Sequence, residues 1–248
     1  MGYLFVFAIG VAVLLLILIV WIVYKNVAPN SNILLCIATD EEKNSLIKTV
    51  EAVKLYGSER GGRTDILITG TGTMSSTVRL LQRLSSAPKN FYSQILNIGF
   101  AGGGFNMVAG KSSEPEKWIP VSEIYDMTIP ADARSPPIVL DTGKIDPTRM
   151  NPTRLETHTE FVDNPDELRN PRNIADMEGY ALATVAKAFN IAFKCYKLVS
   201  DSGNPSDYDA STQTINHPVL RLDDPGNVVL SMDRHKVARV TRDDEQPD

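Results

Sequence analysis

Three acidic residues lie where apolar runs end or helical patterns begin, which is where an α/β protein places its chemistry. They are Glu42, Glu178 and Asp201. Carboxyl groups at such positions can transfer protons or accept hydrogen bonds from a hydroxylated ligand. Acidic residues are also typical of helix starts, and Asp176 is interpreted in that way. Asp201 follows an expected strand at the predicted ligand edge and is therefore the strongest candidate.

Two glycine-rich segments also follow apolar runs. Gly70-Thr71-Gly72 could bind an anion through backbone N–H groups, although an ordinary strand-to-helix turn fits equally well. Ser75 stands where a dinucleotide fingerprint needs its third glycine, and the segment is no P-loop. The run 99–104 has four glycines in six residues, which indicates a backbone that approaches a ligand closely.

Other reactive side chains give no comparable signal. The histidines, His158, His217 and His235, show no metal-ligand spacing and are interpreted as surface or loop residues. Ser200 has no evident histidine partner, which disfavours a hydrolase triad. We therefore expect neither a metal site nor an organic cofactor.

The strands and helices that position these residues can be predicted from alternating apolar runs and helical patterns. Strands are expected at 33–38, 66–69, 95–98, 118–125 and 193–199, and helices at 40–56, 74–84 and 176–190. Residues 130–171 hold seven of the fifteen prolines and should be loop-rich, whereas the last forty residues show no convincing periodicity. This alternation predicts an α/β domain with its ligand site beyond the carboxyl ends of the strands.

An uncharged apolar segment, residues 3–24, precedes this domain. As a helix it would span about 33 Å, enough to cross a bilayer. It lacks the basic start and cleavage context of a signal peptide, which favours a single-pass anchor. Lys25 follows the segment, and a positive charge beside a membrane span favours the cytosolic side. The large domain is therefore expected in the cytosol. The predicted parts are an anchor at 1–25, a linker at 26–32, a catalytic domain at 33–241 and a disordered tail at 242–248.

The composition excludes several classes of protein. The 248 residues include 25 Lys and Arg against 30 Asp and Glu, a net charge of −5, which argues against a nucleic-acid partner. No second long uncharged run exists, so a multi-pass membrane protein is excluded. Cys36 and Cys195 lie in apolar runs and are expected to be buried free thiols.

Four short motifs occur in a fixed order within residues 33–205. They are Ala38-Thr39-Asp40-Glu41-Glu42, Thr69-Gly70-Thr71-Gly72, the run from Asn97 to Gly103, and Met177-Glu178 followed by Ser200-Asp201. Their order and spacing resemble those of the purine nucleosidase and nucleoside phosphorylase superfamily, most closely the 5′-methylthioadenosine/S-adenosylhomocysteine nucleosidases. The resemblance implies a three-layer α/β/α domain with a mixed central sheet, here preceded by a transmembrane helix. It also implies a homodimer.

The resemblance assigns roles in cleaving an N-glycosidic bond. Asp201 would protonate the purine at N7, and Ser200 would help to fix that carboxylate. Glu178 and the Met177 backbone would hold the ribose hydroxyls, and Glu42 would activate the attacking water.

The remaining implied contacts surround the base and sugar. Phe161 would stack on the purine, and the Val162 backbone would form hydrogen bonds to it, although Thr159-Glu160 replaces the usual Gly-Asp before them. The backbone expected to approach the nucleoside comprises Gly70, Gly72, Gly99, Phe100, Ala101 and Gly102.

These residues are consistent with three functions. Neutral Asn97, where hexameric phosphorylases carry an arginine, favours hydrolysis of a methylthioadenosine-like nucleoside. Arg63, Arg79 and Arg83 lie near the glycine turn in sequence and keep phosphorolysis open. The bulky Phe100 and the irregular C-terminal segment keep a non-catalytic nucleoside sensor or effector open.

Overall fold

The computed structural model describes residues 14–18, 31–103, 118–140, 153–164, 167–170, 172–201, 205–214, 216–223 and 227–230. The chain divides into two units, Met1–Asn30 and Ser31–Asp248. Of the predicted anchor, only residues 14–18 are described, as a helical stretch. No helix within the described ranges has the length and apolar character needed to span a bilayer. The rest of 3–24, residues 26–30 of the linker and the tail at 242–248 lie outside the described residues.

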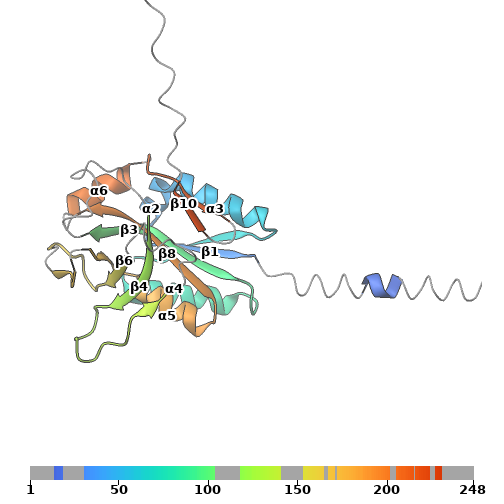
Figure 1. Cartoon of the computed structure of the whole chain (residues 1–248), viewed down its shortest axis with the longest axis horizontal. Coiled ribbons are helices and arrows are strands. Elements are labelled where there is room, and N and C mark those ends of the chain that lie inside the picture. Colours follow the sequence, from blue (N-terminus) through green and yellow to red (C-terminus); the bar gives the residue numbers. More distant parts are fainter. Residues whose placement is uncertain are drawn as a thin grey trace, which may run out of the picture. The chain divides into compact units, whose positions relative to one another are not determined.

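The larger unit alternates strands and helices (Figure 1). In chain order the elements are β1 (Ile33–Ile37), α2 (Asp40–Ser45), α3 (Ile47–Glu59), β2 (Thr64–Ile68), α4 (Thr73–Ser86), β3 (Gln94–Gly103), β4 (Trp118–Asp126), β5 (Ile138–Val139), β6 (Thr153–Thr157), β7 (Ile174–Asp176), α5 (Gly179–Ala188), β8 (Ala192–Asp201), α6 (Pro205–Gln213), β9 (Leu220–Asp223) and β10 (Asn227–Leu230).

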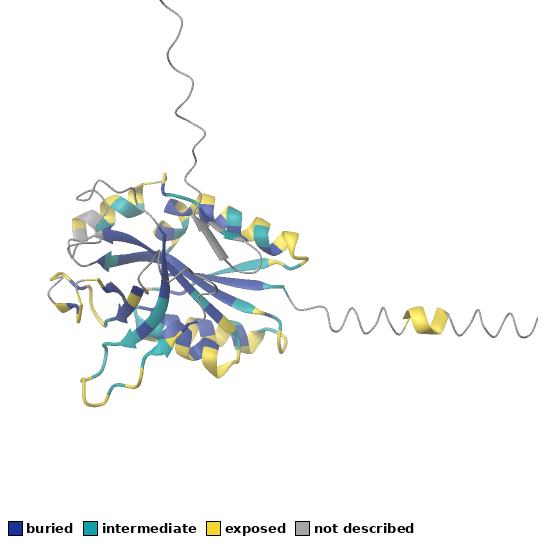
Figure 2. Ribbon diagram, viewed as in Figure 1, coloured by how far each residue is buried: buried dark blue, intermediate teal, exposed yellow. Residues whose placement is uncertain are grey.

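Helices cover both faces of the central sheet (Figure 2). Along β1, Leu34 and Cys36 face one apolar cluster, which includes residues of α4 and α5. Ile33, Leu35 and Ile37 face a second cluster that includes Leu46 and residues of α3. A strand covered on both faces is a continuous apolar run, which is why β1 was predictable. The layers are therefore α/β/α.

The sheet is mixed, as predicted, and part of it closes on itself. Parallel pairing joins β2, β1, β3 and β8. Strand β4 runs antiparallel to β8 and parallel to β6, β6 is parallel to β7, and β7 returns antiparallel to Gly102 and Gly103 of β3. The strands β3, β8, β4, β6 and β7 thus form a closed ring of paired strands. Because β3 is long, it pairs with β1 over its first residues and with β7 over its last.

Several helix and strand boundaries differ from the prediction. The expected helix at 40–56 is two helices joined at Leu46, and α3 continues past Gly57 to Glu59. Gly57 therefore lies inside the helix and does not end it. The position needs a glycine for close packing, since a Cβ there would lie 2.5 Å from Thr64 Oγ1. The glycine run after position 98 continues β3 to Gly103, because its backbone pairs with β8.

The predicted start of the helix at 176 is also wrong. Asp176 ends β7, opposite Thr157 of β6, and α5 begins at Gly179. Strand pairing therefore holds Asp176 outside the helix. The C-terminal region contains α6 and the β9–β10 hairpin, which periodicity did not reveal. This hairpin is fixed by a distant contact, since Leu220 N donates to Thr49 Oγ1 of α3 at 3.1 Å.

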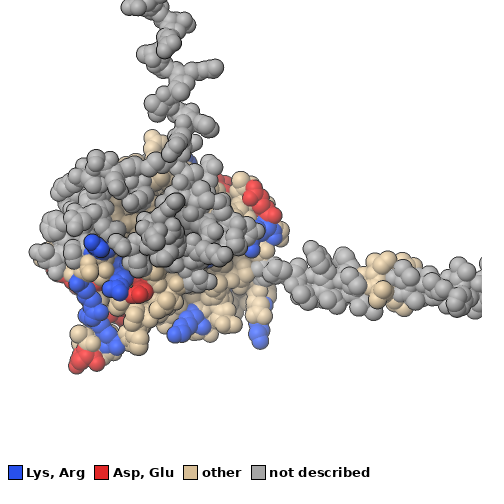
Figure 3. Space-filling model, in the orientation of Figure 1, with Lys and Arg blue, Asp and Glu red and all other residues tan. Residues whose placement is uncertain are grey.

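The surface carries both signs of charge. On the face shown in Figure 3, lysine and arginine side chains lie in separate groups, with acidic side chains beside some of them. Local ion pairs such as Lys54–Glu51, at 2.9 Å, contribute to this mixing. The described residues of this face therefore offer no continuous basic track to a polyanion.

Candidate active site

A cavity of about 320 Å³ lies at the carboxyl ends of the central strands. Its wall combines the segments after β1 and β2, the end of β3, the β7–α5 junction, and α6. The lining residues are Ala38, Thr39, Glu41, Glu42, Thr71, Phe100, Ala101, Gly102, Phe161, Ala175, Asp176, Met177, Glu178, Tyr208, Asp209 and Thr212. This is the sheet edge at which the alternating pattern predicted a ligand site.

Glu42 lies in the first turn of α2, which Thr39 caps by accepting a hydrogen bond from Glu42 N at 3.2 Å. The glutamate is only 4% exposed. Its Oε1 accepts a hydrogen bond from the Tyr208 hydroxyl at 3.0 Å, whereas Oε2 has no hydrogen-bond partner among the described residues. Burial raises the pKa of Glu42, and the Lys197 charge and the Tyr208 hydroxyl partly offset this rise. A buried carboxylate of raised pKa is suited to proton transfer.

Gly99 gives Glu42 the space that this position needs. A Cβ built on Gly99 would lie 2.8 Å from Glu42 Oε2 and 3.7 Å from Lys197 Nζ. The close neighbour of Gly99 is therefore a side chain of the cavity wall, whereas the sequence predicted close approach to a ligand.

Gly99→Ala is expected to lower catalytic turnover by about 10- to 100-fold, because the added methyl group displaces the Glu42 carboxylate. The free energy of unfolding should fall by only about 1–3 kcal/mol, as in an overpacked core. Turnover and urea unfolding of the same preparation measure both effects. A folded variant with wild-type turnover would contradict this account of Gly99.

Glu178 forms another part of the wall. Its Oε1 accepts a hydrogen bond from Gly72 N at 2.8 Å, which joins the β7–α5 junction to the turn before α4. Gly72 has φ +89°, a conformation that favours glycine. Burial and the negative charge of Asp176 raise the pKa of Glu178 to about 7, although Lys197 and the Gly72 N–H act in the opposite direction.

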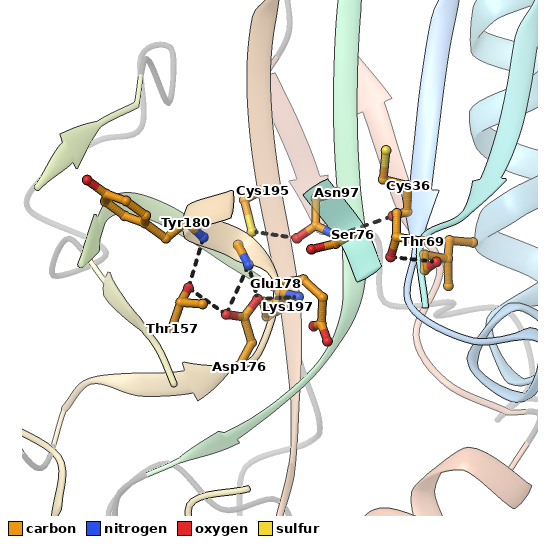
Figure 4. A network of polar contacts seen from close by, with 12 residues as sticks. Cys36, Thr69, Ser76, Asn97, Thr157, Asp176, Glu178, Tyr180, Cys195 and Lys197 are labelled. Atoms are coloured by element: carbon orange, nitrogen blue, oxygen red, sulfur yellow. Dashed lines mark hydrogen bonds and ion pairs between the residues drawn. The ribbon is translucent and has the colours of Figure 1, made fainter. Parts of the chain in front are cut away.

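Lys197 and Asp176 form an ion pair close to Glu178 (Figure 4). Their charges also act on Glu42. Lys197 Nζ lies 2.9 Å from Asp176 Oδ2, and both side chains are almost completely buried. Asp176 Oδ1 also accepts from Thr157 Oγ1 at 2.9 Å, and Gly179 N donates to the carboxylate. Burial alone would lower the pKa of Lys197, but the Asp176 charge reverses this and raises it.

The sequence analysis missed Lys197, although the signal was present. A lysine within a strand buried on both faces requires a partner of opposite charge. Asp176 ends β7 and lies before the following helix, but its carboxylate accepts a hydrogen bond from the Gly179 N–H at the start of that helix. Its partner in β8, however, is 21 residues away in sequence, and no local pattern pairs them.

Aromatic side chains form one side of the cavity. Phe100 is buried, and its ring centroid lies 6.2 Å from that of Tyr208 and 5.1 Å from that of His217. Phe161 lies nearer the solvent, 6.4 Å from Tyr208 between ring centroids. His217 is therefore buried, and its Nε2 lies 2.9 Å from Ser211 O. The prediction of a surface position for His217 is wrong.

The structure places the other predicted site residues as follows. Ala101, Gly102 and Met177 line the same cavity as the two glutamates. Val162 belongs to a small apolar cluster with Leu168 and Ala175, beside a second, smaller cavity that also involves Phe161.

Two predicted residues lie at the end of β8. Ser200 Oγ donates to Ala101 O at 3.4 Å. The Asp201 backbone pairs with Gly102 of the cavity wall, and its side chain lies outside the described atoms. Gly70 lies in the turn after β2 with φ +74°, but it is not among the described lining residues.

The arginines considered for phosphate binding have other partners. Arg63 and Arg83 both bind Asp65 Oδ2, and Arg79 donates to Ile68 O. None of the described lining residues is a lysine or arginine. The cavity wall that the structure describes is therefore acidic and aromatic. Cys36 and Cys195 are buried free thiols, as predicted.

The fold is thus a three-layer α/β domain with a mixed central sheet and an acidic cavity at the carboxyl ends of its strands. No family model matches the sequence, and no curated protein does. Solved structures do match. A protein from Borrelia burgdorferi, assigned as a 5′-methylthioadenosine/S-adenosylhomocysteine nucleosidase and bound to adenine, has TM-score 0.54 and 21% identity. The match covers 74% of this chain and 94% of that one.

Two further matches have the same description. The Streptococcus pneumoniae nucleosidase in complex with 8-aminoadenine has TM-score 0.55 and 14% identity, covering 72% of this chain and 91% of that one. A Helicobacter pylori nucleosidase variant with 5′-methylthioadenosine in its active site has TM-score 0.54 and 12% identity, covering 72% and 90%. At these identities the comparisons show the fold.

Proposed function

We propose that this chain is a purine nucleosidase that hydrolyses the N-glycosidic bond of a methylthioadenosine-like nucleoside. The main support for the proposal is that Glu42 and Glu178 line the same cavity. They arise from α2 and the β7–α5 junction, and burial raises the pKa of both. The solved structures with this fold are described as nucleosidases, which supports the same reaction class.

The reaction needs a proton donor at the base and a nucleophile at the sugar. Asp201 donates a proton to purine N7 as the bond from C1′ to the base breaks, and the bonding electrons leave with the base. Positive charge develops on the ribose, and a water attacks C1′ while Glu42 accepts its proton. The products are the free purine and a ribose derivative.

Glu178 holds the ribose. Gly72 N–H binds one of its oxygens, and the carboxylate retains capacity to accept bonds from the 2′- and 3′-hydroxyls. Phe161 and Phe100 supply aromatic surface for the purine. The lining gives a 5′-phosphate no described cationic partner, which favours an uncharged 5′ substituent.

Binding of the nucleoside is expected to weaken as the pH falls through about 7, because Glu178 then becomes protonated and no longer accepts hydrogen bonds with both oxygens. With a pKa of about 7, affinity at about pH 6 should be roughly tenfold lower than at about pH 8. Calorimetric titration with a non-hydrolysable nucleoside analogue measures this. Glu178→Gln should bind the analogue more weakly, and its affinity should depend much less on pH. A Glu178→Gln protein with the wild-type pH dependence would contradict the role assigned to Glu178.

The central test measures base release by the full chain. The purified protein is incubated with methylthioadenosine, adenosine, inosine and guanosine, with and without phosphate. Free base without phosphate supports hydrolysis, whereas release only with phosphate would establish phosphorolysis. Calorimetric binding without any product would establish the nucleoside sensor, which the bulky Phe100 in the cavity wall favours as the second candidate.

We also propose that residues 3–24 anchor the chain to a membrane with the nucleosidase domain in the cytosol, and that the domain forms a homodimer. The anchor is supported by the uncharged length of this segment alone. Alkaline extraction of membranes carrying the full chain tests it: release into the soluble fraction would overturn the anchor.

A further inference from the structure

Tyr208 connects the C-terminal helix α6 to the candidate general base. Its hydroxyl donates to Glu42 Oε1 at 3.0 Å, across 166 positions of the sequence. Its ring packs edge-to-face against both Phe100 and Phe161. One side chain thus contacts three parts of the cavity wall: α2, β3 and the segment after β6.

The position of Tyr208 is set by the backbone that carries it. Ser45 Oγ of α2 is within hydrogen-bonding distance of Ser211 O, at 3.2 Å, and Thr214 O, at 2.6 Å. Ser211 Oγ donates to Ser200 O of β8 at 3.3 Å. Helix α6 is therefore attached to the helix that bears Glu42 and to the strand that ends at Asp201. This arrangement gives the Tyr208 hydroxyl a defined place beside the carboxylate.

Few groups compete for the Glu42 carboxylate. The charged and titratable groups that act on it are Lys197 of β8, Asp176 of β7, Glu178 and Tyr208. Lys197 is committed to Asp176 at 2.9 Å. Tyr208 provides the one described side-chain hydrogen bond to this carboxylate, in addition to an interaction with the Ala38 backbone. Oε2 is buried and has no side-chain partner among the described residues.

We propose that Tyr208 is a positioning residue for the hydrolytic step, whose hydroxyl holds Glu42 Oε1 in the cavity wall ready to accept a proton from water. The inference rests on the proposed function. An oxygen that accepts one hydrogen bond from a tyrosine retains a second lone pair for the water. The same hydrogen bond favours the ionised form of Glu42 and lowers its pKa against the effect of burial.

The test compares Tyr208→Phe with the full-length wild type over the pH range in which the protein is active. Phenylalanine keeps the ring contacts with Phe100 and Phe161, so only the hydroxyl is lost. Tyr56→Phe is the matched control, since the Tyr56 hydroxyl binds Arg60 on α3. We expect kcat of Tyr208→Phe to fall about tenfold with little change in KM. The acidic limb of its pH profile should move to higher pH, because Glu42 becomes harder to ionise.

A second measurement separates positioning from general packing. If Tyr208 acts through Glu42, its substitution should have little further effect on the residual rate of Glu42→Gln, so the two losses are not additive. Additive losses, or an unshifted pH profile in an active Tyr208→Phe protein, would overturn the inference. Failure of the wild type itself to release base would instead overturn the proposed function. Carbon-13 NMR titration of Glu42 in both proteins gives the direction of the pKa change without activity.

Discussion

Asp201→Asn is expected to lower the rate of base release by about a thousandfold, the largest loss that we predict for one substitution. Asparagine has nearly the shape of aspartate but cannot donate a carboxyl proton to purine N7. The departing purine would then carry its negative charge without protonation. The backbone of Asp201 pairs with Gly102, which lines the cavity. Single-turnover base release in phosphate-free buffer measures the effect.

Asp209→Asn is the matched control for this experiment. Asp209 lines the same cavity from α6 and is exposed, so its substitution changes the local charge by the same amount. If Asp201 supplies the proton, the control should lose less than about tenfold. Full activity of Asp201→Asn would refute this residue as the acid, whereas equal losses in both variants would assign the effect to net charge.

Lys197→Met is expected to give the largest loss of stability, about 3–5 kcal/mol in the free energy of unfolding at neutral pH. The substitution removes a buried cation and leaves Asp176 without its ion-pair partner, with Glu42 and Glu178 nearby. Urea unfolding measures the loss. Lys187→Met is the control, because Lys187 is exposed on α5 and its substitution should change stability by no more than about 0.5 kcal/mol.

The stability of Lys197→Met should also depend on pH in a defined direction. The Lys197 charge lowers the pKa values of Glu42 and Glu178. Without it, the pKa values of these two glutamates in the folded state rise further above those in the unfolded chain. The folded state then retains protons that the unfolded chain releases, so stability falls as the pH rises above about 4. The variant should therefore recover stability towards pH 5. Asp176→Asn combined with Lys197→Met should be more stable than Lys197→Met alone; an equally unstable double variant would contradict the ion-pair explanation.

The strands were predictable where burial imposes a local pattern. Residues 33–38 form an apolar run because β1 is covered on both faces. The motifs containing Glu42 and Glu178 lie on one cavity, as their places at the sheet edge indicated. Helix boundaries were less predictable, because Asp176 is held in β7 by its pairing with β6 and Gly57 serves packing.

Contacts between distant segments could not be predicted in this way. Tyr208 belongs to a helix without a clear apolar face, and its bond to Glu42 depends on how α6 attaches to α2 and β8. The buried position of His217 has the same origin. The closed ring of strands depends on the length of β3, whose glycine-rich end was predicted to lie beyond the strand and close to a ligand.

The sequence by itself determined the alternation of elements, the acidic candidates and the sheet edge at which they lie, because burial periodicity and chain order are local properties. Only the tertiary structure decided which charged and polar groups contact one another. Lys197 with Asp176, Tyr208 with Glu42, and Gly72 with Glu178 are pairs from separate elements. A buried polar group must find a partner in three dimensions, and strand order and helix packing select that partner.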